Sequence, residues 1–398
     1  MDYSTPACTL ARDADGVLID VGSLYTQFAA LSDRRHRRGL RYPLPVVLVA
    51  LVLAKLAGED KPCGIAEWVQ LRKELFIETF GLKHASMPHH TSYRRILRDA
   101  LAADDLERMA SEFLTGLPEV GRNVQITLDG KTVRGTMAFG QTRGLHLLAA
   151  YLPGAGIALL QVEVDPRTSE IGAAPQVLKM LDLQGKIVTG DALLAQRELS
   201  LIIGQAGGDY VWTVKDNQPR LRQDIELLFA PDVTLVPGFN TGPTDFRTAR
   251  TVNSGHGRIE IRTLVTSSAL KETSDWPYLE QVFKLERESR IRVSGVVRRD
   301  VVYGVTSLTV AEASPARLLE LVRGHWGIEN GLHYRRDVTL KEDACRVKDW
   351  TVAHALAILN NLVLGLLLRG GNRNAARARR RYAAHPDEGL ALLLRCPT

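Results

Sequence analysis

The chain has 398 residues, of which 45% are hydrophobic and 24% are charged. This length and balance are typical of a folded protein with two or three structural units, and they exclude collagen-like and largely disordered classes. The formal net charge of +6 and the pI near 9.1 favour polyanionic partners, because clustered Lys and Arg side chains bind phosphates.

The cysteine and hydropathy patterns favour a cytoplasmic protein. Four cysteines lie far apart without a Cys-x-x-Cys pair, so neither a zinc knuckle nor a disulfide framework is indicated. The N-terminus lacks an apolar signal core. The apolar stretch 46–54 is far shorter than the roughly 20 residues of a membrane span, and we interpret it as a buried helix.

Residues 1–24 form an N-terminal tail without a clear pattern, and helical periodicity follows over 25–118. Apolar residues recur three or four positions apart in PLPVVLVALVLAKLAG, CGIAEWVQLRKELFIETFGL, TSYRRILRDAL and DDLERMASEFLTGL. This spacing predicts a small all-α N-terminal domain.

From Val124 the apolar period changes to two, which indicates strands. The segment VQITLD is expected to form a strand that ends on Asp129 and leads into a turn at Gly130-Lys131. The next expected elements are strands at 146–152 and 157–164, a helix at about 170–182, the strand KIVTG before Asp191, a helix at about 196–206, and the strand YVWTVK. This order predicts an α/β fold with a mixed sheet, as in ribonuclease-H-like folds.

Strand-rich segments at about 240–312 are interpreted as a β insertion within a catalytic domain that spans 119–370. Ser314-Pro315 is a typical helix start, and the helix that follows is expected to carry Glu329 near its middle. Residues 371–398 are rich in arginine and are expected to form a basic C-terminal tail.

Asp129, Asp191 and Glu329 are therefore candidates for one shared metal site. The ends of the first and fourth strands of such a sheet lie side by side, and a flanking helix can supply the third carboxylate. Mg²⁺ prefers carboxylate oxygens, and a pair of ions stabilises both the attacking and the leaving oxygen of a phosphoryl transfer.

Each residue also has a structural interpretation. Asp129-Gly130 is a common turn dipeptide, and Asp191 is suited to capping a helix that begins near Ala192. Glu329 lies between His325 and His333 at helical spacing, which fits a solvated face or, less well, a zinc pair, because histidine is a poor ligand for Mg²⁺.

Four stretches carry a resemblance to a known family: LDGKTVRGT (128–136), KIVTGDALLAQRE (186–198), GGDYVWTVKDNQPRL (207–221) and RGHWGIENGLHYRRDVTLKEDACR (323–346). The chain resembles the DDE transposases of bacterial insertion sequences, in particular the ISAs-type group with the H-repeat-associated proteins. The resemblance extends over about 25–370, and the last stretch is the most specific.

The resemblance implies a ribonuclease-H-like core with a β insertion, and it matches Asp129, Asp191 and Glu329 to the catalytic, metal-binding acids. It further implies two Mg²⁺ ions, with Mn²⁺ as a substitute. The sequence departs from the wider class, which tends to have Tyr, Arg and Lys at positions occupied here by Val322, His325 and Arg336. Leu193-Leu194-Ala195 is also bulkier than the usual Met-Gly pair.

Double-stranded DNA is the expected partner, both as transposon ends and as target, with a homo-oligomer assembling on it. The candidates for contact with DNA are Arg34, Arg35, Arg37, Arg38, Lys131, His325, Arg335, Arg336 and Lys348. Asn217 and Gln218 are interpreted mainly as turn or capping residues.

The expected activity is metal-dependent cleavage at transposon ends followed by strand transfer. Two alternatives stay open: a domesticated DNA-binding protein, and a nuclease of the same fold that cuts without joining.

Overall fold

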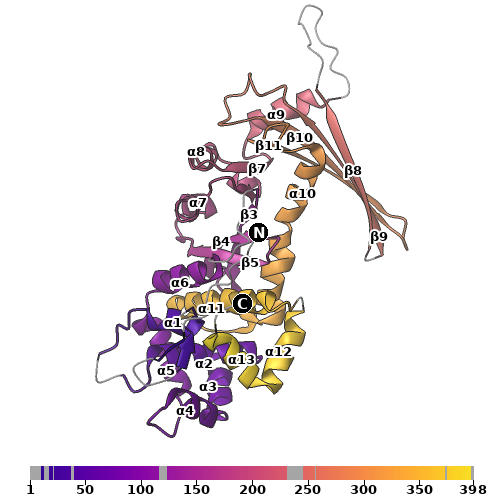
Figure 1. Ribbon diagram of the computed structural model, residues 1–398. Helices are drawn as coiled ribbons and strands as arrows, with labels where there is room; N and C mark the ends of the chain where they lie inside the picture. Colours follow the sequence, from indigo (N-terminus) through magenta and orange to yellow (C-terminus); the bar gives the residue numbers. More distant parts are fainter. Residues whose placement is uncertain are drawn as a thin grey trace, which may run out of the picture.

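The computed structural model describes residues 10–12, 18–20, 22–36, 40–115, 123–230, 245–255, 257–372 and 374–395. Helices gather at one end of the molecule, a mixed sheet runs through its middle, and long strands extend from the other end (Figure 1).

Short helices fill the region in which the apolar period is helical, after a small antiparallel hairpin of β1 (Leu10–Arg12) and β2 (Leu18–Asp20). The helices are α1 (Leu24–Ala29), α2 (Leu44–Leu56), α3 (Pro62–Gln70), α4 (Lys73–Phe80), α5 (His90–Arg95), the π-helix η2 (Ile96–Ala100) and α6 (Ala103–Thr115). Helix α2 is buried almost all round, as its continuous apolar sequence predicts.

The C-terminal segment differs from the expected tail. It folds into α12 (Ala375–Ala384) and α13 (Pro386–Leu394), which pack against α2. Arg379 is buried, donates to the carbonyl of Lys55 and pairs with Asp60 at 2.5 Å. An arginine-rich sequence therefore forms part of the core, because its inward-facing guanidinium has a buried acidic partner.

Helix α11 (Trp350–Arg369) joins the helical end to the sheet, packing against α6, α2 and β5. It is longer than the apolar 46–54 stretch singled out in the sequence. By length and composition it would be able to cross a membrane, but 89% of its most apolar window is buried inside the protein. We therefore interpret α11 as a core helix.

A nine-stranded sheet has the strand order β5-β4-β3-β6-β7-β11-β10-β9-β8. The strands are β3 (Gln125–Val133), β4 (Leu145–Leu152), β5 (Ile157–Glu163), β6 (Ile187–Gly190), β7 (Asp209–Val214), β8 (Arg247–Gly255), β9 (Arg258–Ser267), β10 (Gln281–Ile291) and β11 (Val297–Thr306). Strands β3, β4 and β5 are antiparallel neighbours, whereas β6 and β7 run parallel to β3. This topology confirms the predicted ribonuclease-H-like mixed sheet.

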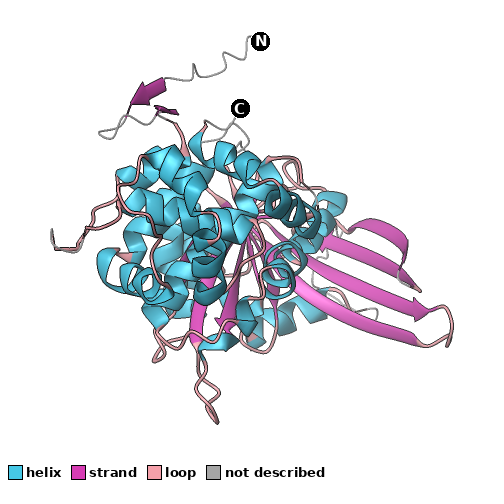
Figure 2. Cartoon of the chain, turned by 90° about the horizontal axis from the view of Figure 1, so that it is seen from below, coloured by secondary structure: helices cyan, strands magenta, loops and turns pink. Residues whose placement is uncertain are grey.

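The β insertion is continuous with this sheet. Strand β11 pairs antiparallel with β7, from Tyr303 opposite Val214 to Thr306 opposite Val211. The outer ends of β8 to β11 extend past the helices (Figure 2), and most side chains near the β10–β11 turn are exposed.

Helices cover both faces of the central strands. Helices α7 (Glu170–Lys179), α8 (Arg197–Gln205) and α9 (Pro219–Leu228) lie on one side, and α10 (Pro315–His325) lies on the other. In β6, Val188 packs in the core with α7 and α8, whereas Ile187 packs in the core with α10. Adjacent residues of β6 thus face opposite layers, as alternation along a strand requires.

One local prediction was wrong. Strand β3 does not end at Asp129; it continues to Val133 and pairs with β4 through Gly130 and Lys131. Glu329 lies in a helical segment after Ser314, as expected, but α10 itself ends at His325. The segment continues as two π-helices, η5 (Glu329–His333) and η6 (Arg335–Thr339), before a 3-10 turn, η7 (Glu342–Ala344). Ser314 caps α10 as expected, accepting a hydrogen bond from the Arg317 amide.

Candidate active site

Asp129 lies in β3, and Asp191 directly follows β6, the parallel strand beside it. Thr127 of β3 is in register with Thr189 of β6, so each aspartate lies two residues beyond a paired threonine. Neighbouring strands are about 4.8 Å apart, and residues two apart share a face. The register therefore brings together two carboxylates that the sequence separates widely.

A series of hydrogen-bonded polar side chains, called here the polar ladder, precedes this pair along the two strands. The Thr127 and Thr189 hydroxyls are 3.1 Å apart, and the Gln125 amide nitrogen donates to Thr189 Oγ1 at 2.9 Å and to the carbonyl of Leu321 in α10 at 2.8 Å. The ladder ties α10 to the face of the sheet on which the aspartates lie.

Two glycines on either side of Glu329 in the sequence, Gly324 and Gly331, pack closely against the sheet and so position Glu329. A Cβ atom on Gly324 would lie 2.1 Å from Gln125 Oε1, and one on Gly331 would lie 2.0 Å from the Tyr151 hydroxyl. These glycines let the end of α10 approach β3 and let η5 approach β4. Glu329 lies between them in sequence and is held over the sheet.

Three side chains form a compact donor set. The Nδ1 atom of His333 lies 3.5 Å from Asp129 Oδ2 and 3.6 Å from Glu329 Oε2. One potential ligand atom from each of these residues lies within 4.8 Å of the others. Asp191 is outside this set, and its Oδ1 accepts hydrogen bonds from the amides of Leu193 and Leu194 at 2.9 and 3.3 Å. The capping interpretation of Asp191 thus describes its present contacts.

The electrostatics reflect crowded negative charge. Burial, together with the nearby Glu329, Glu170 and Asp191 carboxylates, raises the pKa of Asp129 to about 7. Burial likewise raises the pKa of Asp191, with Glu170 adding to the effect. Mutual repulsion of this kind favours a cation that neutralises the carboxylates.

Glu170 is a fourth acid that the sequence did not single out. It begins α7, on the other side of the sheet from α10, and its Oε1 lies 2.9 Å from His146 Nε2. Its charge acts on both aspartates. No motif could have identified Glu170, because an acidic residue in the first turn is common in any helix.

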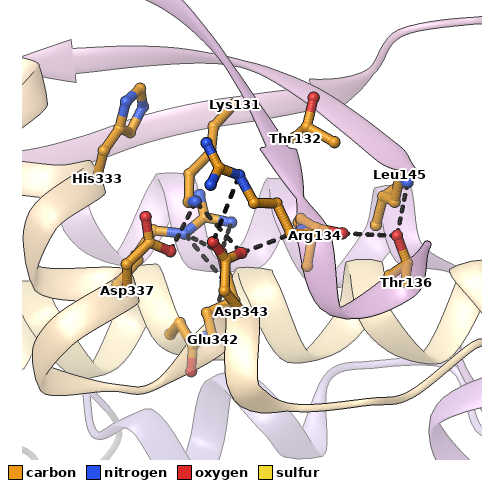
Figure 3. Close-up of polar contacts among 12 residues, drawn as sticks. Lys131, Thr132, Arg134, Thr136, Leu145, His333, Asp337, Glu342 and Asp343 are labelled. Carbon is orange, nitrogen blue, oxygen red and sulfur yellow. Dashed lines mark hydrogen bonds and ion pairs between the residues drawn. The ribbon is translucent and has the colours of Figure 1, made fainter. Parts of the chain in front are cut away.

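Lys131 and Arg336 were expected to contact DNA, but their burial contradicts this. Lys131 pairs with Asp337 at 2.7 Å and approaches Asp343 at 3.7 Å (Figure 3). Arg336 is fully buried and pairs with Glu342 at 2.9 Å. Both cations stabilise the interior beneath the site, because a buried charge requires a bonded partner.

The other expected DNA contacts differ in their surroundings. Lys348 is exposed, and its ammonium donates to the carbonyls of Gly135 and Met137. His325 and Arg335 are half-buried, and burial lowers the pKa of His325 to about 4.

Four of the expected DNA contacts, Arg34, Arg35, Arg37 and Arg38, form a basic cluster near the N-terminus. Arg34 is exposed, whereas Arg35 pairs with Asp33 at 2.6 Å. Arg37 and Arg38 lie outside the described residues.

Asn217 and Gln218 have structural contacts. The Asn217 amide donates to the carbonyl of Ala192 at 2.5 Å, and the Gln218 amide donates to that of Ala195 at 3.0 Å. These bonds support their interpretation as turn residues and fix the loop that follows Asp191.

The residues present fit a divalent cation. Asp129 and Glu329 offer carboxylate oxygens, which suit Mg²⁺ and Mn²⁺, and His333 adds a nitrogen that suits the transition metals. Bonds of about 2.1 Å place the ligands of an octahedral ion about 3.0 to 4.2 Å apart. The separations in this set are close to that range, so small side-chain movements would close the site.

The structure thus has a ribonuclease-H-like sheet with one candidate acid, Asp129, within a central strand and another, Asp191, directly after the neighbouring strand. Comparison with known proteins specifies the class of protein. The family model described as "Transposase DDE domain" matches residues 122–366, and the model "DDE_Tnp_1-associated" matches residues 25–114. The chain therefore belongs to the DDE transposase domain family.

The chain is also similar over most of its length to individual relatives. It is 27% identical to "Putative transposase YncI" of Escherichia coli O157:H7, covering 88% of each chain. It is 24% identical to "H repeat-associated putative transposase YhhI" of Escherichia coli K12, covering 88% of this chain and 91% of the relative. A solved piggyBac transposase synaptic complex with hairpin DNA covers 92% of this chain and 78% of its own, with a TM-score of 0.43 and 11% identity.

Proposed function

We propose that this protein cleaves DNA at transposon ends and joins the freed ends to target DNA, in a reaction that depends on Mg²⁺ or Mn²⁺. The observation that carries the proposal is the convergence of Asp129 and Glu329 on one donor set, with Asp191 directly after the neighbouring strand β6. Family membership supports the transposase class.

Asp129, Asp191 and Glu329 are the proposed metal-binding acids. Divalent ions at such a site activate the attacking oxygen and neutralise the charge that develops on the leaving oxygen. Asp129 comes from the rigid middle of a strand and Glu329 from a π-helix. Asp191 caps a 3-10 turn, η4 (Ala192–Leu194), through Oδ1, and its Oδ2 atom is the oxygen that can bind a metal while the cap is kept.

The proposed partner is double-stranded DNA, with a homo-oligomer formed on it. The net charge of +6 supports a polyanionic partner. Arg34, Arg37, Arg38, Arg335 and Lys348 stay candidates for backbone contacts, as does His325 through its half-buried ring. Lys131, Arg336 and Arg35 are assigned instead to internal ion pairs.

The test is a reaction of the full chain with linear DNA that carries the inverted repeats flanking its reading frame. With Mg²⁺ we expect nicks at the repeat ends and strand-transfer products with a second DNA. Cleavage without joining would favour a stand-alone nuclease. Binding without metal-dependent cleavage would refute the proposed activity and favour a domesticated DNA-binding protein.

A further inference from the structure

His333 is a buried group that the three proposed metal-binding acids leave without a role. It is 6% exposed, and its Nε2 atom has no hydrogen-bond partner. Its Nδ1 atom faces the Asp129 and Glu329 carboxylates at 3.5 and 3.6 Å, too far for a hydrogen bond to either oxygen. The Nδ1 atom therefore faces two carboxylates without bonding either of them, which is the orientation expected of an atom that binds a cation together with them.

We propose that His333 is a further ligand of the divalent ion held by Asp129 and Glu329, bound through Nδ1. This inference rests on the proposed metal site and adds a nitrogen donor to its carboxylates.

The backbone holds His333 in the required place. Glu329 and His333 lie at the two ends of η5, four residues apart, so both side chains leave the same side of the turn. The Tyr334 amide donates to the carbonyl of Glu329, a bond over five residues that defines the π-helix. Such turns are rare and occur frequently at functional sites.

The buried cations near His333 do not pair with the carboxylates that it faces. Lys131 and Arg336 are both buried, and each is held by its own acid, Asp337 for Lys131 and Glu342 for Arg336. A divalent ion bound by the imidazole nitrogen and the two carboxylates would neutralise Asp129 and Glu329.

A nitrogen ligand has a consequence for metal choice. Imidazole binds Mn²⁺ and later transition ions better than it binds Mg²⁺, which prefers oxygen donors. We therefore expect the chain to bind Mn²⁺ more tightly than Mg²⁺, by more than an all-carboxylate site would.

The experiment is pulsed electron paramagnetic resonance on the full chain loaded with Mn²⁺, which detects coupling of the ion to a bound ¹⁴N nucleus. We expect nitrogen coupling in the wild type and none in His333→Phe or His333→Asn. The Phe variant keeps a ring of similar size, and the Asn variant keeps a polar side chain. We therefore expect at least one of the two variants to fold. His325→Phe is the matched control and should keep the coupling.

Titration with Mn²⁺ separates this inference from the proposed function. We expect His333→Phe to weaken Mn²⁺ binding at least tenfold, a loss of the kind seen when metal-site partners are removed. The assignment of His333 is wrong, and the carboxylate site stands, if Asp129→Asn abolishes Mn²⁺ binding but the wild type shows no nitrogen coupling. The same conclusion follows if Asp129→Asn abolishes Mn²⁺ binding but His333→Phe keeps the nitrogen coupling. If the wild type binds no Mn²⁺, the proposed metal site fails as well.

Discussion

Replacement of Asp129 by Asn tests the site through stability, independently of catalysis. The pKa of Asp129 is raised from 3.8 to about 7, and its side chain is only 20% exposed. A shift of about three pH units corresponds to about 4 kcal/mol. Because the folded-state pKa is raised, this stabilisation is complete below about pH 4 and is lost as the pH rises through about 7. Asn carries no charge that could repel the neighbouring carboxylates, so Asp129→Asn does not lose this stabilisation as the pH rises.

The stability advantage of Asp129→Asn over the wild type should therefore grow with pH. The wild type should lose about 3 kcal/mol of stability through the ionisation of Asp129 between pH 5 and pH 8. A chain of 398 residues has an unfolding entropy of roughly 0.8 kcal/mol/K, so the melting temperature of the variant relative to the wild type should rise by about 3 °C across this range.

The assay is thermal unfolding of the metal-free full chain at the two pH values. Glu320→Gln, at an exposed acid of α10 with 69% side-chain exposure, is the control and should show no such change. Added Mg²⁺ should stabilise the wild type at the higher pH and leave Asp129→Asn unchanged, because an ion that binds only the folded state shifts the transition. Parallel pH profiles for wild type and Asp129→Asn would refute the electrostatic reasoning.

Three further predictions concern residues outside the metal site. Burial raises the pKa of Glu107 to about 8, so Glu107→Gln should gain stability over the wild type as the pH rises through that value, measured by thermal unfolding. Arg336→Ala should destabilise the fold by about 3–5 kcal/mol in urea denaturation, because it leaves a buried acid unpaired, and a loss below about 1 kcal/mol would contradict that account. Replacing Arg34, Arg37 and Arg38 by Ala should weaken DNA binding and reduce its dependence on salt, and an unchanged salt slope would show that these arginines do not contact phosphates.

The central sheet was predictable because its strands have clear sequence signals. The segments 146–152 and 157–164 became β4 and β5 almost unchanged, and KIVTG delivered Asp191 as expected. Each is a short apolar run bounded by turn residues, a pattern that local sequence determines.

The remaining differences arise from tertiary contacts. The arginine-rich segment after residue 371 was interpreted as a tail, because nothing local indicates that Arg379 meets Asp60 from the N-terminal helices. The same holds for Arg336, whose partner Glu342 becomes apparent only once the chain turns back after η6. A charged residue in sequence is more often solvated than buried, and only the fold shows which one has a partner.

Strand order and family resemblance point to Asp129, Asp191 and Glu329 as candidate acids, and the structure places Asp129 and Glu329 in one donor set. The proposed contribution of His333 depends on a π-helix that the periodicity of 315–336 does not indicate. Glu170 reaches the site from the opposite layer, which no spacing in the sequence reveals.

The most direct test of the account is single-turnover cleavage of transposon-end DNA by the wild type, Asp129→Asn, Asp191→Asn and Glu329→Gln. Each variant keeps side-chain volume and removes a charge that holds a hard cation, so cleavage should slow by roughly three orders of magnitude or more. DNA affinity should change little, since phosphate contacts come mainly from Lys and Arg.

Glu320→Gln is the control in this measurement. It is a better control than Asp337→Asn, because Asp337 pairs with the buried Lys131 and its loss would disturb the fold. The account predicts wild-type cleavage by Glu320→Gln and almost none by the three acid variants. Wild-type cleavage by Glu329→Gln would contradict its assignment as a metal ligand, and wild-type cleavage by all three would contradict the metal site itself.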